Sequence, residues 1–200
     1  MVRLSPLFNM LFVLAVLTAA VATRATEPAS DPVAPATGPN PISAEALIGW
    51  GFCQGSNCDH VGGSLGISLA GFYRLTPKIA VGGEFEYQAY SASNADSMYM
   101  LDFAVAGRYY HDLGLCPLMK KPLSVFGHVA LGWTNFSWEW AGESDSVSGF
   151  FIEPGAGAQW ELTPRINLVL LVKLQLNMWM DDNFDSFNNF YFGLGAGYRF

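Results

Sequence analysis

Charged residues are scarce in this chain of 200 residues, at 14% of the sequence, whereas soluble domains carry roughly 25%. Basic residues are scarcer still, because 10 Lys and Arg stand against 17 Asp and Glu. The chain therefore has no basic stripe that could neutralise phosphates, which argues against nucleic-acid binding. Long apolar runs are also missing: beyond the N-terminal segment, no stretch reaches the roughly 20 residues that a membrane-spanning helix needs.

Hydrophobic residues are nevertheless abundant, at 51% of the chain. They are spread evenly along the sequence, and in many segments they alternate with polar or small residues. Glycine, with 21 residues, and aromatic residues, at 14%, are both frequent. A transmembrane β-barrel has this pattern, because only one face of each strand meets lipid.

The N-terminus has the features of a secretory signal peptide, predicted over residues 1–22. Arg3 supplies the positive charge, Leu11 to Leu17 form the apolar region, and Ala20-Val21-Ala22 fits the cleavage pattern, with Ala25 as a second site. The alternative is an uncleaved membrane anchor, for which the apolar region is short. Residues 23–43 are rich in Pro and Ala and predict a disordered linker.

The rest of the chain, residues 44–200, predicts strands separated by turns. The clearest alternation runs from Ile166 to Met178. Leu75-Thr76-Pro77-Lys78-Ile79 and Leu162-Thr163-Pro164-Arg165-Ile166 predict two similar tight turns, whereas Ser91–Ser97, Glu139–Ser148 and Met180–Asn188 read as longer loops. Two turns on one side of a membrane need an even number of spans between them, and four are predicted there. Because the linker is expected on the same side as these turns, one further span is needed before residues 62–74. This makes eight spans in all, at residues 45–53, 62–74, 79–90, 98–110, 123–138, 149–161, 166–179 and 189–200.

The C-terminus alternates apolar with small residues and ends on Phe200, with Tyr198 two places before. This pattern resembles the C-terminal signature of bacterial outer-membrane barrels. With the signal peptide and eight strands, the chain resembles the OmpA-like and OmpX-like family. The resemblance implies an all-β fold: an eight-stranded antiparallel up-and-down transmembrane β-barrel. It also implies that the barrel lies in the outer membrane, with both the linker and the C-terminus in the periplasm. It further implies a monomer with a structural, adhesive or protective role, with the barrel-assembly machinery recognising Tyr198 and Phe200 and with lipid and lipopolysaccharide as partners.

An eight-stranded barrel is narrow enough for side chains to fill its lumen. Unpaired charges are costly there, so the inward charges predict an ion-pair network. Its members are Glu84, Glu86, Asp102, Arg108, Glu153, Glu161, Lys173 and Arg199. This network predicts a structural plug, and a narrow ion-conducting pore is the alternative. The rival fold is a secreted lipocalin-like barrel, with its apolar faces inward and its charges outward.

Few residues suggest chemistry. Lipid A deacylases of the outer membrane carry a His-x-Ser pair, which is absent after His128, although a Ser-His-Asp arrangement at His60 stays open as an alternative. We therefore expect no enzyme activity and no cofactor. Cys53 and Cys58 predict a disulfide in an oxidising compartment, with a metal site including His60 as the alternative. Cys116 is expected on the other side of the membrane, either free or in an intermolecular bond.

The acidic segment around Asp181, Asn183 and Asp185 has the opening spacing of a calcium loop. The following glycine and the distal glutamate of that motif are missing. We therefore expect a solvated acidic loop and no resident metal.

Overall fold

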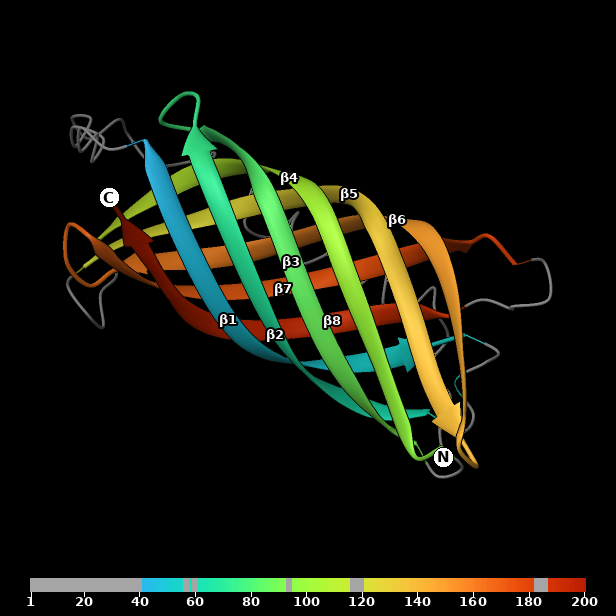
Figure 1. The fold of residues 1–200 in the computed structure, drawn as a ribbon. Coiled ribbons are helices and arrows are strands. Elements are labelled where there is room, and N and C mark those ends of the chain that lie inside the picture. Colours follow the sequence, from blue (N-terminus) through green and yellow to red (C-terminus); the bar gives the residue numbers. More distant parts are fainter. Residues whose placement is uncertain (1–40, 56–57, 59–60, 93–94, 116–120, 182–186) are drawn as a thin grey trace. The chain divides into compact units, whose positions relative to one another are not determined.

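The structure, a computed structural model, describes residues 41–55, 58, 61–92, 95–115, 121–181 and 187–200. The predicted signal peptide, most of the predicted linker, His60, Cys116, Asn183 and Asp185 lie outside these residues. Eight strands form one closed sheet (Figure 1). They are β1 Ile42–Gln54, β2 Val61–Arg74, β3 Ile79–Ala92, β4 Ser97–Leu115, β5 Pro122–Trp140, β6 Glu143–Glu161, β7 Ile166–Trp179 and β8 Asn188–Arg199. None of the described residues forms a helix long and apolar enough to cross a membrane.

Every strand pairs antiparallel with the next one, and β8 pairs with β1 to close the ring. The eight predicted spans are confirmed, including the least obvious one, at residues 45–53. It becomes β1, which starts at Ile42, two residues before the predicted start of the barrel domain. The register Ala46↔Ala196 joins β1 to β8 and leaves the barrel with no open edge at this seam.

The barrel has two distinct ends. The first, which we call the termini end, carries the start of β1, the end of β8 and both Thr-Pro turns. In each turn a threonine hydroxyl accepts a hydrogen bond from the backbone three residues on, at 3.0 Å for Thr76 with Ile79 and for Thr163 with Ile166. The two turns are therefore equivalent, as their sequences predicted. The connection from β4 to β5 is at this end too. The opposite end, which we call the loop end, carries the connections β1–β2, β3–β4, β5–β6 and β7–β8.

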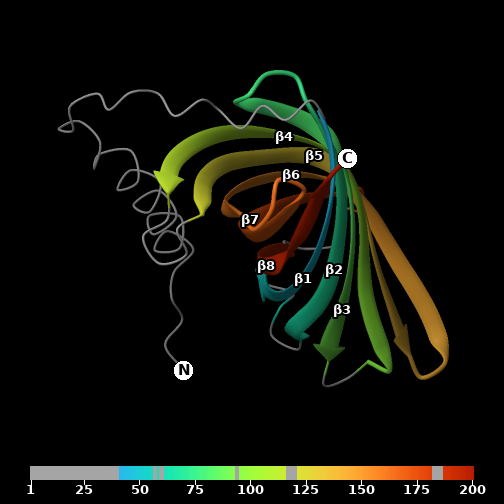
Figure 2. The same ribbon diagram turned by 90° about the vertical axis from the view of Figure 1, so that its left-hand side faces the viewer.

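One expectation at the loop end was wrong. The loop predicted at Glu139–Ser148 is a continuous hairpin, in which β5 and β6 pair up to Trp140↔Glu143 (Figure 2). Ala141 and Gly142 form the whole turn, with φ values of 51° and 82°. Two successive residues with positive φ match the right-handed twist of paired strands, which is why such turns close tight hairpins.

The two faces of the sheet have opposite chemistry. Large apolar side chains such as Ile48, Trp50 and Leu131 are more than half exposed on the outer wall. Charged side chains such as Glu86, Arg108 and Lys173 are buried inside. A secreted lipocalin-like barrel would have the reverse arrangement, so that rival fold is wrong for this chain.

Candidate functional site

The strongest cluster of functional groups lies in the middle of the lumen. Alternation along each strand turns every second residue inward, and six strands contribute ionisable side chains to this layer. They are Glu45 of β1, Glu84 and Glu86 of β3, Asp102 and Arg108 of β4, His128 of β5, Glu153 of β6 and Lys173 of β7. All eight are buried. We call them the charged layer.

Lys173 lies at the centre of the carboxylates. Its Nζ is 2.7 Å from Glu86, 2.9 Å from Glu153 and 3.9 Å from Glu84. It also faces the ring of Tyr191, with the ring centroid at 5.2 Å. One ammonium group therefore connects strands β3 and β6 across the interior and compensates several buried negative charges at once.

Arg108 is the second organising cation. Its guanidinium lies 2.7 Å from Glu45 and 3.5 Å from Glu84. The same group stacks over the rings of Phe72 and Phe126, at 4.0 and 4.5 Å from their centroids. Ion pairing and cation–π contact together hold this charge in an apolar environment.

The structure does not gather all the predicted network residues. Glu161 and Arg199 pair with each other and are partly exposed, separately from the charged layer. Asp102 has no ion pair among the described residues, and its Oδ1 has no hydrogen-bond partner there. Two members of the layer were missed by sequence reasoning, Glu45 and His128. Alternation within β1 places Glu45 on the inward face, opposite to the outward residues. His128 faces inward as well, because it is the register partner of Arg108.

Three members of the charged layer have the residue types of a metal site, namely Glu84, His128 and Glu153. His128 Nε2 is 3.6 Å from a carboxylate oxygen of each glutamate. However, Arg108 Nε donates a hydrogen bond to His128 Nδ1, at 3.4 Å. In a neutral imidazole that accepts at Nδ1, the proton is on Nε2, which then has no lone pair for a metal. With the Lys173 ammonium already beside Glu153, these residues fit an ion-pair network and do not fit a metal centre.

A polar relay continues from the charged layer towards the loop end. Gln88 is its hub and donates to Glu86. Its Oε1 accepts hydrogen bonds from Ser64 at 2.7 Å, Asn189 at 2.9 Å and Tyr90 at 3.1 Å. These bonds join β2, β3 and β8 through the interior, so the wall of the barrel is cross-linked by side chains as well as by its strands.

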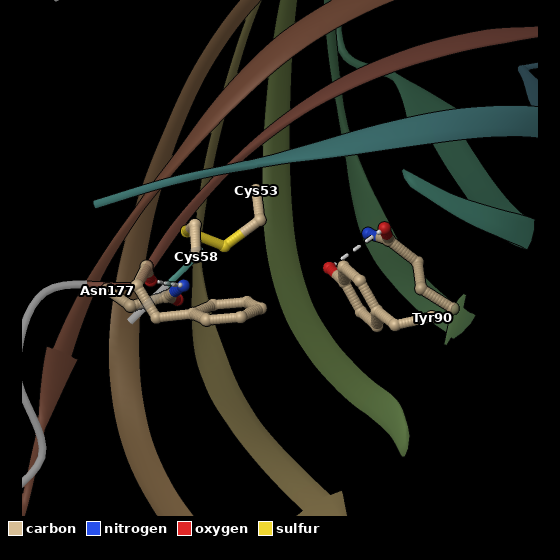
Figure 3. Close-up of a disulfide and its surroundings, with 6 residues drawn as sticks. Cys53, Cys58, Tyr90 and Asn177 are labelled. Atoms are coloured by element: carbon tan, nitrogen blue, oxygen red, sulfur yellow. Dashed lines mark hydrogen bonds between the residues drawn. A yellow bond between two sulfur atoms is a disulfide. The ribbon is translucent and has the colours of Figure 1, made fainter. Parts of the chain in front are cut away.

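Aromatic rings close the lumen above this relay. Phe136 and Phe187 pack with centroids 4.6 Å apart, and Tyr90 is 5.8 and 5.5 Å from them. Figure 3 shows Tyr90 near the disulfide of Cys53 and Cys58, the pair predicted from sequence. Both cysteines pack against this cluster, which we call the aromatic lid.

Apolar side chains fill the lumen on the other side of the charged layer. Phe72, Tyr110 and Phe126 belong to this cluster, together with small and aliphatic residues from most of the strands. Arg74 lies over the ring of Tyr110, at 4.3 Å from the centroid. The charged layer is thus enclosed between two hydrophobic layers.

The comparisons agree with this architecture. Residues 11–200 match the family described as outer membrane protein beta-barrel domain, and the chain belongs to that family of the bacterial outer membrane. None of the curated protein sequences matches it.

Among solved structures, the fold is similar to Neisserial surface protein A, with a TM-score of 0.63, 12% identity, and coverage of 80% of this chain and 97% of that one. It is similar to Ail, the attachment invasion locus protein of Yersinia pestis, with a TM-score of 0.54, 18% identity and coverage of 80% and 97%. It also resembles the N-terminal barrel domain of OprF from Pseudomonas aeruginosa, with a TM-score of 0.50, 14% identity and coverage of 80% and 98%.

Proposed function

We propose that this protein is a closed, non-enzymatic barrel that reinforces the outer membrane and presents its loop end as a contact surface. The observation that supports a closed barrel is the stacking of three filled layers in the lumen: an apolar layer, the charged layer and the aromatic lid. Ions passing through would have to displace buried rings and a network of paired charges, which is costly in a low dielectric. In this proposal the charged layer is a structural plug.

The proposed orientation places the termini end in the periplasm. Short turns lie on the periplasmic side in barrels of this kind, and both Thr-Pro turns are at the termini end. Among the described residues, the exposed cations are also confined to the termini end, where the exposed carboxylate Asp112 of β4 lies as well. These cations are Lys78, Lys121 and Arg165. The exposed carboxylates of the loop end are Asp96, Glu139, Glu143, Asp145 and Asp181. Acidic loops facing lipopolysaccharide fit a surface that divalent ions bridge to lipid phosphates.

Ion flux from liposomes that contain the reconstituted protein distinguishes a structural plug from a narrow ion-conducting pore. We expect the wild type to release no potassium, and Lys173→Ala to release none either, because the aromatic lid stays in place. Adding Phe136→Ala and Phe126→Ala to Lys173→Ala opens all three layers, and this triple variant is expected to produce flux. Flux from Lys173→Ala alone would identify the charged layer as a gate and would favour the narrow pore.

The hairpin of β5 and β6 supports adhesion as a second function. Trp140 at its tip is 65% exposed, and exposed aromatic residues are enriched at protein contact surfaces. The pairing of β6 with β7 begins only at Gly149↔Trp179, so residues 143–147 of β6 stand beyond β7. Ail, named as an attachment protein, shares this fold, which makes a contact role for the loop end a reasonable proposal.

Adherence of bacterial cells that express the protein tests this second function. A variant with residues 137–146 replaced by a two-residue turn is expected to reach the outer membrane normally and to lose most adherence to epithelial cells. Trp140→Ala is the finer test of the exposed ring. Unchanged adherence of both variants at equal surface levels would exclude the hairpin as an adhesive surface.

A further inference from the structure

We infer that the outer wall near the termini end carries a binding groove for an acyl chain of an anionic phospholipid. The groove is an open depression with a volume of about 860 Å³ and an almost wholly apolar lining. It lies across β8, β1, β2 and β3 and reaches the start of β7 at Ile166, and its exposed lining residues face away from the lumen.

Small residues in register form the floor of the groove. Ala44 pairs with Gly71, and Gly71 pairs with Gly83, so three neighbouring strands are nearly bare at one level. One step further from the termini end, Ala46 pairs with Ala196. Neighbouring strands are about 4.8 Å apart, so these residues leave a depression several strands wide. Larger apolar residues border it, namely Leu69, Phe85, Ile166 and Tyr198.

The fold itself does not require a glycine at the centre of this floor. A Cβ atom added at Gly71 would meet no atom within 4 Å, and one added at Gly83 would meet only the carbonyl oxygen of Ala104, at 3.8 Å. Neither residue has a positive φ. Glycine is unfavourable inside a strand because it adds no packing surface. Open glycines also occur elsewhere on the wall, at Gly107 and Gly127. What distinguishes the floor is that its small residues adjoin in register across neighbouring strands, which leaves space that a group outside the chain can fill.

The surroundings specify what that occupant is. The outer wall of an outer-membrane barrel faces hydrocarbon, so an acyl chain is the apolar group available to fill the groove. Arg165, exposed in the turn before Ile166, donates a hydrogen bond to the hydroxyl of Tyr198 at 3.4 Å. Tyr198 and Ile166 both line the groove. A cation therefore lies at its rim on the termini end, where it can pair with a lipid phosphate.

The charge distribution of the molecule agrees with an anionic headgroup at this end. The chain is acidic overall, with a net charge of −7, yet the exposed lysines and arginines of the described residues cluster at the termini end. Basic residues beside a membrane surface attract anionic lipids. The combination of an apolar groove with Arg165 at its rim thus matches both parts of a phospholipid.

Native mass spectrometry of the refolded barrel in detergent tests the groove, with phosphatidylglycerol as the probe and phosphatidylcholine as its neutral counterpart. We expect the wild type to retain one phosphatidylglycerol. Gly71→Leu is expected to weaken retention at least tenfold by filling the floor. Gly127→Leu is the matched control, because a Cβ there also meets no atom within 4 Å but Gly127 lies on β5, away from the groove. Arg165→Gln is expected to remove the preference for phosphatidylglycerol over phosphatidylcholine.

Ala46→Leu fills the same floor from β1 and replaces Gly71→Leu if that variant does not refold, as judged by heat-modifiable migration on a gel. Equal lipid retention by the wild type, the groove-filling variant and Gly127→Leu would overturn the proposal. So would a wild-type dimer that the groove-filling variant converts to a monomer without loss of lipid, since a second copy of the chain would then be the occupant.

Discussion

Arg108 shows how one buried residue links the layers of the lumen. Its guanidinium pairs with Glu45 and stacks between Phe72 and Phe126. The paired charges lose their hydration on burial, so the pair contributes little to stability compared with an apolar replacement. Removing one partner alone lowers stability strongly, because the remaining charge stays buried without compensation.

We therefore expect Arg108→Ala to lower the free energy of unfolding by about 3–5 kcal/mol, the usual cost of breaking a buried ion pair. Urea unfolding of the refolded barrel in lipid vesicles measures this. The double variant Glu45→Gln with Arg108→Met keeps the side-chain volumes and removes both charges, so it is expected to recover most of the loss. A double variant as unstable as Arg108→Ala would show that stacking, and not charge, dominates at this position.

Which residues face the lumen could be predicted from alternation, and which of them pair could not. Glu84, Glu86, Asp102, Arg108, Glu153 and Lys173 are all buried. Their contacts cross the barrel: Arg108 of β4 reaches Glu45 of β1, which is not its neighbour in the sheet. Such contacts depend on the stagger of the closed sheet and on side-chain rotamers, and neither can be read from the period of a single strand.

At the scale of elements, the hairpin of β5 and β6 depends on an unusual turn residue. Ala141 has a φ of 51°, a left-handed conformation that costs a non-glycine residue roughly 1–2 kcal/mol. The sequence indicated a loop there because Ser144, Asp145 and Ser146 show no apolar face. A hairpin tip exposed to water on both sides needs no apolar face. Alternation of apolar and polar residues therefore cannot predict that its strands continue.

Ala141→Gly is expected to raise the stability of the barrel by up to about 1 kcal/mol, because glycine adopts positive φ without a steric penalty. The same substitution at Ala89, an exposed position inside β3, is expected to have the opposite sign, since glycine weakens a strand. Thermal or urea unfolding of both variants measures the difference. Destabilisation by Ala141→Gly would mean that the turn is not strained.

The disulfide of Cys53 and Cys58 ties the end of β1 to the connection that follows it. The two residues are five apart in sequence, and closing so short a loop stabilises the folded chain by roughly 2 kcal/mol in the chain-entropy view. We expect the Cys53→Ser, Cys58→Ser double variant to fold into the same barrel with a loss of that size. Reductant should have the same effect on the wild type and none on the double variant; an effect of reductant on both would place the sensitivity elsewhere.

At the scale of the whole molecule, the closed topology followed from the sequence because membrane geometry restricts the alternatives. Both Thr-Pro turns are at one end, so the number of spans between them is even. The expected position of the linker on the same side as these turns then required one further span before 62–74, which identified residues 45–53 as a strand. The lengths of β4, β5 and β6, each 19 residues, could not be predicted, because parity counts spans and does not limit how far a strand extends beyond the membrane.

The C-terminal residue permits a test of assembly that is separate from stability. Phe200 is 58% exposed, so it contributes little to the core of the barrel. If assembly factors recognise the last strand, as the resemblance of the C-terminus implies, we expect Phe200→Ala to refold normally in detergent but to accumulate several-fold less in the outer membrane of cells. Phe103→Ala, at a residue with 56% exposure on β4, is the control and should assemble normally. Equal assembly of both variants would remove the special role of Phe200.

Single-channel recording of the wild-type protein in a planar bilayer tests the sealed lumen most directly. Three filled layers predict a silent trace in concentrated potassium chloride, with no discrete current steps while heat-modifiable migration shows that the barrel is folded. Reproducible steps that scale with the amount of folded protein would contradict a sealed lumen and would make the charged layer part of an ion path.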